Sequence, residues 1–154
     1  MHTRPRQEKI VAQILSRKQV AHFLPLSRAP RKYGNRETTV SLPLFPGYLF
    51  VCGDWNAREA AWRTNRVATI LDAPDQDGLR AELGLVYRLV TSGERIGLAK
   101  LVRGTRCRVV AGPLRGLEGT VLNQLSRCRI YVAMTMLNRS VTVEIDDACL
   151  EPAS

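Results

Sequence analysis

The spacing of apolar residues changes once along this chain of 154 residues, and the change falls between residues 92 and 100. Before it, helical spacing alternates with short β-forming runs. After it, only the two-residue alternation of half-buried strands recurs. Residues 92–100 contain two glycines and break the helical period, which predicts a linker. We therefore expect two domains, 1–91 and 101–154, joined by residues 92–100.

The first domain is expected to have an α+β fold, with an antiparallel sheet flanked by helices. Helical spacing predicts helices over residues 6–21, capped by Thr3, and over residues 77–91. Asn56 is the expected cap of a further helix that runs through Trp62. Strands are predicted over residues 21–26, 37–42, 48–52 and 67–71.

A basic segment between the first two of these strands contains Gly and Pro and predicts a hairpin. It runs from Arg28 to Arg36, and Tyr33-Gly34-Asn35-Arg36 is the expected tip. The second domain shows the alternation of half-buried strands over residues 106–109, 130–134 and 141–145. About 50 residues with four or five short strands predict a small all-β barrel, which closes to remove its exposed edges.

Positive charge is concentrated at one end of the chain. The net charge is +9, but residues 1–36 contain nine Lys or Arg and one acid, so the other 118 residues sum to only +1. A one-sided field of this kind favours a polyanionic partner such as nucleic acid. The alternative is a solvated basic surface that maintains solubility.

Reactive groups are sparse, which argues against an enzyme. His2 and His22 lack metal-ligand spacing, and no phosphate-binding loop or nucleophile motif occurs, so we expect no catalytic site, metal or cofactor. Asp72, Asp75 and Asp77 predict a turn before a helix. No apolar run is long enough for a membrane span or a signal peptide. The wide spacing of the cysteines predicts a cytoplasmic protein without disulfides. We expect the four to pack as small hydrophobic residues; they are Cys52, Cys107, Cys128 and Cys149.

The segment from Gly104 to Val121 predicts two strands joined by a glycine-rich loop with a proline. It resembles the KOW motif of SH3-like barrels in transcription and ribosomal proteins. Residues 132–145 look like the remaining strands of that barrel in the NusG family. The residues that carry the resemblance in the loop are Gly112, Pro113, Arg115, Gly116 and Gly119.

The first domain carries an independent resemblance to the same family. Residues 42–51, Leu-Pro-Leu-Phe-Pro-Gly-Tyr-Leu-Phe-Val, are similar to the central signature of the NusG N-terminal domain, in the form found in RfaH-like specialised paralogues. Residues 2–8 resemble the junction between that domain's first strand and first helix. The family's first strand is therefore expected to be missing here. The resemblance covers nearly the whole chain.

The resemblance implies a monomeric transcription elongation and antitermination factor that is not an enzyme. The N-terminal domain would dock on the clamp helices of RNA polymerase beside the DNA near the transcription bubble. Among the aromatic residues of this segment, Tyr48 is the expected contact residue and Phe50 the expected core residue. The residues that match the docking surface are His2, Leu44, Phe45, Pro46, Gly47 and Tyr48. The basic residues expected near nucleic acid are Arg4, Arg6, Arg17, Lys18, Arg28, Arg31, Lys32 and Arg36.

In the family, the KOW barrel recruits a ribosomal protein or the termination factor Rho. This chain has Leu137-Asn138 where the family usually has Phe-Gly. An alternative is an RNA-binding ribosome-associated KOW protein, whose barrel loop would bind RNA. That alternative leaves residues 44–48 unexplained and expects a more basic barrel, whereas residues 101–154 hold seven basic and five acidic residues.

Overall fold

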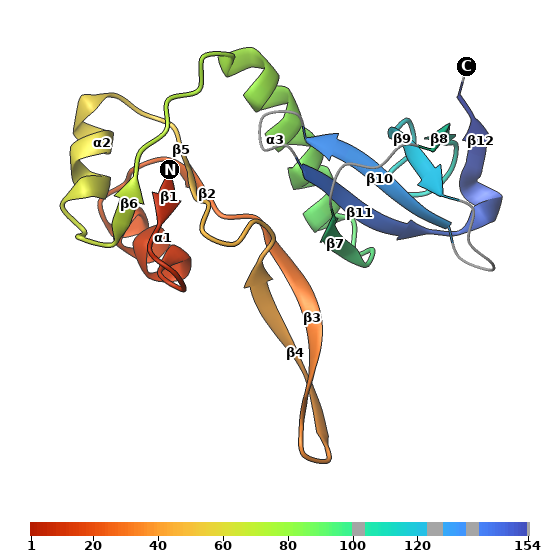
Figure 1. Ribbon diagram of the computed structural model, residues 1–154, viewed down its shortest axis with the longest axis horizontal. Coiled ribbons are helices and arrows are strands. Elements are labelled where there is room, and N and C mark those ends of the chain that lie inside the picture. The colour runs from red at the N-terminus through yellow and green to blue at the C-terminus, as the bar shows by residue number, and fades with distance from the viewer. Residues whose placement is uncertain (100–103, 123–127, 135–138, 154) are drawn as a thin grey trace. The chain divides into compact units, whose positions relative to one another are not determined.

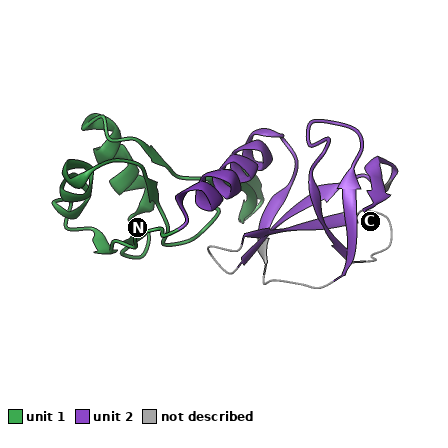
Figure 2. Ribbon diagram, turned by 90° about the horizontal axis from the view of Figure 1, so that it is seen from above, with its two compact units in different colours: residues 1–74 green, residues 75–154 purple. Residues whose placement is uncertain are grey.

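The computed structural model describes residues 1–99, 104–122, 128–134 and 139–153 (Figure 1). The chain forms two compact units, Met1–Pro74 and Asp75–Ser154, which Figure 2 shows in green and purple. Helices and strands occur in both units, so the fold is mixed α+β, as the sequence predicts. The extents of the two domains, 1–91 and 101–154, stay predictions.

The first unit contains helices α1 and α2 and strands β1 to β6. They are β1 (His2–Thr3), α1 (Glu8–Arg17), β2 (His22–Phe23), β3 (Leu26–Tyr33), β4 (Arg36–Pro43), β5 (Phe50–Val51), α2 (Trp55–Trp62) and β6 (Val67–Thr69). The two helices and the strands at β2, β4, β5 and β6 agree with the sequence predictions in type and order, whereas β1 was not predicted and β3 extends through the predicted hairpin segment. The observed α1, β2, β5 and β6 are shorter than expected.

The strands of this unit form three separate antiparallel ladders, where the sequence analysis expected one sheet. The pairs are β1 with β6, β2 with β5, and β3 with β4, and an isolated bridge joins His2 to Tyr48. Pro43 and Pro46 have no N–H to donate to a ladder. The chain also turns at residues 44–47, between β4 and β5, which explains why these two strands do not belong to one continuous sheet.

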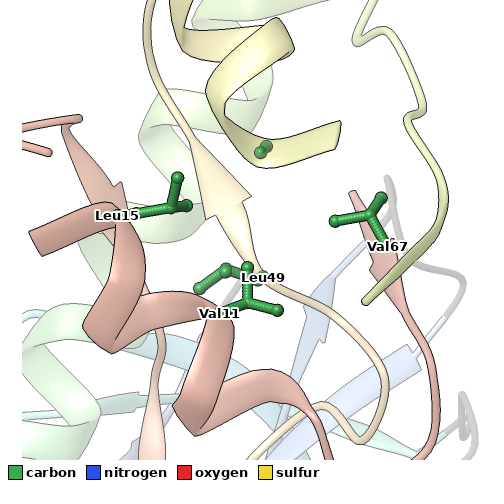
Figure 3. Packing of buried hydrophobic residues seen from close by; sticks show 5 residues of the cluster. Val11, Leu15, Leu49 and Val67 are labelled. Atoms are coloured by element: carbon green, nitrogen blue, oxygen red, sulfur yellow. The ribbon is translucent and has the colours of Figure 1, made fainter. Parts of the chain in front are cut away.

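A small apolar core joins both helices to β6 and to the segment before β5. Val11, Leu15 and Leu49 are fully buried, and Ala61 and Val67 complete the cluster (Figure 3). Burying an aliphatic side chain of this size contributes about 1.5–3 kcal/mol. Helix α1 therefore depends on the chain around residue 49 for much of its stability.

Helix starts differ from the expected caps. Gln7 precedes α1 without a capping side-chain hydrogen bond, and Thr3 lies buried in β1. Asp54 caps α2 in place of Asn56, because its carboxylate accepts from two N–H groups of the first turn. The predicted turn before the last helix is confirmed, since the carboxylate of Asp75 accepts from Gly78 N at 2.8 Å.

The second unit contains one long helix and the strands of one antiparallel sheet, in the spatial order β12-β8-β9-β10-β11-β7. The elements are α3 (Gln76–Thr91), β7 (Ile96–Ala99), β8 (Thr105–Val109), β9 (Glu118–Leu122), β10 (Cys128–Met134), β11 (Arg139–Ile145), the 3-10 helix η2 (Asp147–Cys149) and β12 (Leu150–Pro152). The three predicted alternations are confirmed, because the inward residues of β8, β10 and β11 are buried.

The expected linker at residues 92–100 is a strand over part of its length. In it, β7 pairs with β11, with Ile96 opposite Val143 and Gly97 opposite Thr142. A Cβ at Gly97 would lie 3.0 Å from Thr142 Oγ1, so this glycine serves close packing between strands. Gly93, with φ of +84°, follows the end of α3. Residue 100 and the Leu137-Asn138 pair lie outside the described residues.

Candidate functional site

The turn at residues 44–48 requires a glycine at its fourth position for two reasons. Gly47 has φ of +83°, a conformation that side chains with a Cβ adopt only at a cost. A Cβ at Gly47 would also lie 2.7 Å from His2 Nε2. The close approach of His2 to this turn therefore depends on the missing side chain.

Residues near the N-terminus fix the turn through hydrogen bonds to both sides of Gly47. Thr3 N donates to Gly47 O at 2.8 Å, and Gly47 N donates to Glu8 Oε1 at 2.7 Å. Glu8 is only 5% exposed, so its carboxylate is a buried charge that meets a backbone donor. Leu49 N donates to Met1 O at 3.1 Å just beyond the turn. The turn is thus fixed by contacts from about 40 residues away in sequence.

An aromatic pair lies on the outside of this turn. The rings of His2 and Tyr48 meet edge to face, with centroids 5.2 Å apart and an interplanar angle of 80°. His2 is exposed and Tyr48 is half-buried. Edge-to-face packing restricts both rings, so they lose little further freedom when a partner binds them.

The other predicted docking residues differ in exposure. Leu44 and Phe45 are buried, and Phe45 packs edge to face against Phe50 at 6.1 Å. Phe50 lies in the core, as the sequence analysis expected. Pro46 is exposed. The accessible part of this surface therefore consists of His2, Pro46 and Tyr48. Leu44 and Phe45 lie beneath it.

Glu8 was not singled out by the sequence analysis. It is the one acidic residue among the first 36 residues. Its isolation among basic residues was the sequence feature that could have marked it as a structural residue. Its position in the first turn of α1 also places a negative charge at the helix N-terminus, where such a charge is stabilising.

Basic side chains are exposed over the first unit. Two precede α1, two lie at its C-terminal end, and four lie on the β3–β4 hairpin. All eight residues that the sequence analysis expected near nucleic acid are exposed: Arg4, Arg6, Arg17, Lys18, Arg28, Arg31, Lys32 and Arg36. They are available to contact a polyanion.

The predicted hairpin tip is confirmed. Strands β3 and β4 pair without a bulge, from the pair Leu26 and Pro43 at the base to the pair Tyr33 and Arg36 at the tip. Gly34 has φ of +59° in the connecting turn. Glycine at the first central position is the signature of a type II′ turn, which suits a tight hairpin. Figure 1 shows this hairpin as a pair of long strands that pair only with each other.

Two exposed tryptophans on α2 were also not anticipated as surface residues. Trp55 is 73% exposed and Trp62 is 55% exposed. They are seven residues apart, which places them on one face of the helix. Their regular spacing was visible in the sequence, but helical periodicity alone could not say that this face points outward.

The glycine-rich loop of the second unit lies between β8 and β9. Gly112 and Gly116 have φ of +79° and +84°, whereas Gly119 lies within β9, where a Cβ would meet Ile130 Cγ2 at 2.4 Å. Pro113 and Arg115 are exposed. Gly119, predicted as a loop residue, is therefore required by strand packing.

A cavity of about 500 Å³ lies beside this loop. Gly112, Pro113 and Leu114 line one part of it, and the acidic Glu144 and Asp146 line another. It offers both apolar and acidic surface next to an exposed loop. A pocket of this size can accept part of a partner molecule.

Charged and thiol groups of the sheet are largely satisfied within the chain. Arg108 donates to Glu118, which holds the pKa of that carboxyl below its usual value, and Glu144 raises the pKa of Arg129. Burial raises the pKa of the Cys107 thiol, in keeping with its predicted role as a small hydrophobe. Cys52 is exposed, contrary to that prediction. The side chain of Cys128 lies outside the described residues.

Neither histidine belongs to a metal site in the described part of the chain. His2 packs on Tyr48, and His22 Nδ1 lies 2.8 Å from Val20 O. Among the described residues, no group of three or more His, Cys, Asp or Glu side chains is placed to bind a metal ion. No described helix is both long and apolar enough to cross a membrane.

The first unit thus combines a fixed aromatic turn with exposed basic side chains, which suit contacts with a protein and with a polyanion respectively. The family model described as transcription termination factor nusG matches residues 1–78, just over half of the chain. The chain therefore belongs to the NusG family, whose members are non-enzymatic transcription factors that act in elongation and antitermination. Among curated proteins, no match to this chain was found.

Proposed function

We propose that this chain is an RfaH-like elongation factor that binds RNA polymerase and promotes processivity and antitermination. The observation that carries the proposal is the 44–48 turn, because it lies within the family-matched residues and is fixed in one conformation by Thr3 and Glu8. A preformed aromatic surface loses little conformational entropy on binding.

The docking surface proposed here has an exposed and a buried part. His2, Pro46 and Tyr48 would contact the clamp helices of the polymerase, since their side chains are accessible. Leu44 and Phe45 would act from beneath, because both are buried. Gly47 would permit the close contact between His2 and the turn.

The exposed basic residues of the first unit would lie along the nucleic acid near the transcription bubble. Lys and Arg side chains neutralise phosphates without reading sequence, so they would steer and position the protein. This role fits the charge distribution, in which +8 of the net +9 lies in the first 36 residues.

The second unit would be a KOW domain that recruits a further partner, a ribosomal protein or Rho. The exposed loop at Gly112–Gly116 and the cavity beside it provide a surface for that contact. The alternative, RNA binding by this unit, is disfavoured by its internal ion pairs. Arg108 lies 2.5 Å from Glu118, and Arg129 lies 2.9 Å from Glu144, so these two arginines already have acidic partners within the chain.

The test is co-purification of the full chain with core RNA polymerase free of nucleic acid. His2→Ala combined with Tyr48→Ala should weaken binding at least tenfold, because aromatic residues dominate interface energetics. The matched control is Tyr33→Ala, which removes an exposed tyrosine from the hairpin. Undiminished binding by the double variant would overturn the docking assignment.

A further inference from the structure

The β3–β4 hairpin has two chemically different faces. Its register is regular, so successive residue pairs point to alternate sides. Tyr33 lies opposite Arg36. Arg31, two residues before Tyr33 on β3, lies opposite Thr38, which places these four residues on one face. We call this the tyrosine face. The opposite face carries Lys32 with Glu37, and further from the tip it carries Pro30 with Thr39, Arg28 with Ser41 and Leu26 with Pro43.

Charge separates the two faces further. Lys32 Nζ lies 3.1 Å from Glu37 Oε1, so the cation nearest the tip on the opposite face is paired. The tyrosine face has no acidic residue, and its two arginines give it a charge of +2. The unbalanced positive charge near the tip therefore lies on the side that also carries the aromatic ring.

The tyrosine face is open to solvent. Tyr33 is 62% exposed, and residues 31–39 are all exposed. Because residues 31–39 are all exposed, the outer part of this hairpin buries no apolar side chain and gains little stability from packing. Burial within the chain therefore gives no reason for an aromatic residue beside two arginines at this place.

We infer that the tyrosine face binds single-stranded nucleic acid, with one base stacked on Tyr33 and the neighbouring phosphates neutralised by Arg31 and Arg36. Stacking requires an accessible base face, which a single strand offers and an intact duplex hides. Arg31 stands two residues before Tyr33 on the same strand, and Arg36 stands directly opposite Tyr33 on β4, so both arginines neighbour the tyrosine position on this face. This inference deepens the proposed function and rests on it, because the transcription bubble would supply the strand.

The test measures binding of the full chain to labelled oligonucleotides by fluorescence anisotropy, with single-stranded DNA, single-stranded RNA and duplex DNA as separate probes. Tyr33→Ala should weaken single-strand binding about tenfold and leave duplex binding nearly unchanged. Tyr33→Phe should retain wild-type affinity, since it keeps the ring. Comparison of the DNA and RNA probes identifies which strand the face prefers.

A charge-matched pair of variants separates the faces. Arg31→Gln with Arg36→Gln removes two charges from the tyrosine face, and Arg28→Gln with Lys32→Gln removes two from the opposite face. The first double variant should lose more single-strand affinity than the second. The slope of its log binding constant against log salt concentration should become shallower by about 0.7 per arginine removed. All these positions are exposed, so the variants should unfold at the wild-type temperature.

Three outcomes would overturn the inference. They are equal losses from the two double variants, equal losses of single-strand and duplex binding in Tyr33→Ala, and no measurable single-strand binding by the unchanged chain. Failure of the proposed function is a separate result. If the His2 and Tyr48 variant keeps its polymerase binding while Tyr33→Ala loses the single strand, the docking assignment fails and the nucleic-acid face stands.

Discussion

The 44–48 turn and the β3–β4 hairpin are neighbours in sequence but are stabilised in opposite ways. The turn is uncharged, largely buried and fixed by Thr3 and Glu8. The hairpin is charged and exposed, and its pairing depends on its own backbone and one tight turn. A rigid aromatic surface suits a specific protein contact, whereas an exposed basic arm suits a polyanion whose position varies.

The strongest test of this contrast compares an aromatic residue from each region. Phe45→Ala should destabilise the protein by about 3–5 kcal/mol, because Phe45 is 2% exposed and packs on Phe50. Tyr33→Ala should change stability by less than about 0.5 kcal/mol, because Tyr33 is exposed. Urea unfolding followed by circular dichroism measures both, and similar values would remove the distinction between the regions.

Two glycines with positive φ give the next comparison. Gly47→Ala should cost about 1–3 kcal/mol from the unfavourable φ, and the added methyl should also displace the His2 ring. Gly34→Ala carries the φ cost alone, about 1–2 kcal/mol, because no atom lies within 4 Å of the added methyl. Thermal unfolding of both variants checks the order. Gly47→Ala should also weaken polymerase binding, while Gly34→Ala should not.

Two glutamates give a smaller difference. Glu8→Ala leaves Gly47 N without its acceptor and should cost about 1–3 kcal/mol. Glu8→Gln keeps an oxygen acceptor and should recover most of that loss. The control is Glu37→Ala, which breaks the exposed pair with Lys32 and should cost less than about 1 kcal/mol. Equal destabilisation by Glu8→Ala and Glu37→Ala would show that the buried hydrogen bond does not stabilise the turn.

Local patterns in the sequence predicted much of this fold. The Tyr33-Gly34-Asn35-Arg36 tip, helix α3 and the alternation in β11 were all predicted, because each depends on residues close together in the chain. The same holds for the turn at Asp75, whose side chain caps a helix that begins at the next residue.

Features set by distant contacts were not predicted. Glu8 is buried where its carboxylate accepts a hydrogen bond from Gly47 N, 39 positions away. No local pattern in the sequence shows this contact. Similarly, β7 was expected as a linker because its pairing partner β11 lies more than 40 residues further on. The burial of Phe45 also follows from its contact with Phe50, and alternation along a strand does not apply within a turn.

The hydrogen bond between Glu8 and Gly47 also limits when the aromatic surface of the 44–48 turn can form during synthesis. Closing a loop of this length costs about 3 kcal/mol of chain entropy, which the contacts around Gly47 must offset. His2 and Glu8 are synthesised before the residues that complete the turn and the core around Leu49, so their contacts form only after those residues are added. A nascent or partly unfolded chain therefore presents the basic residues before it presents the aromatic surface, so polymerase binding would report on completed folding of the first unit.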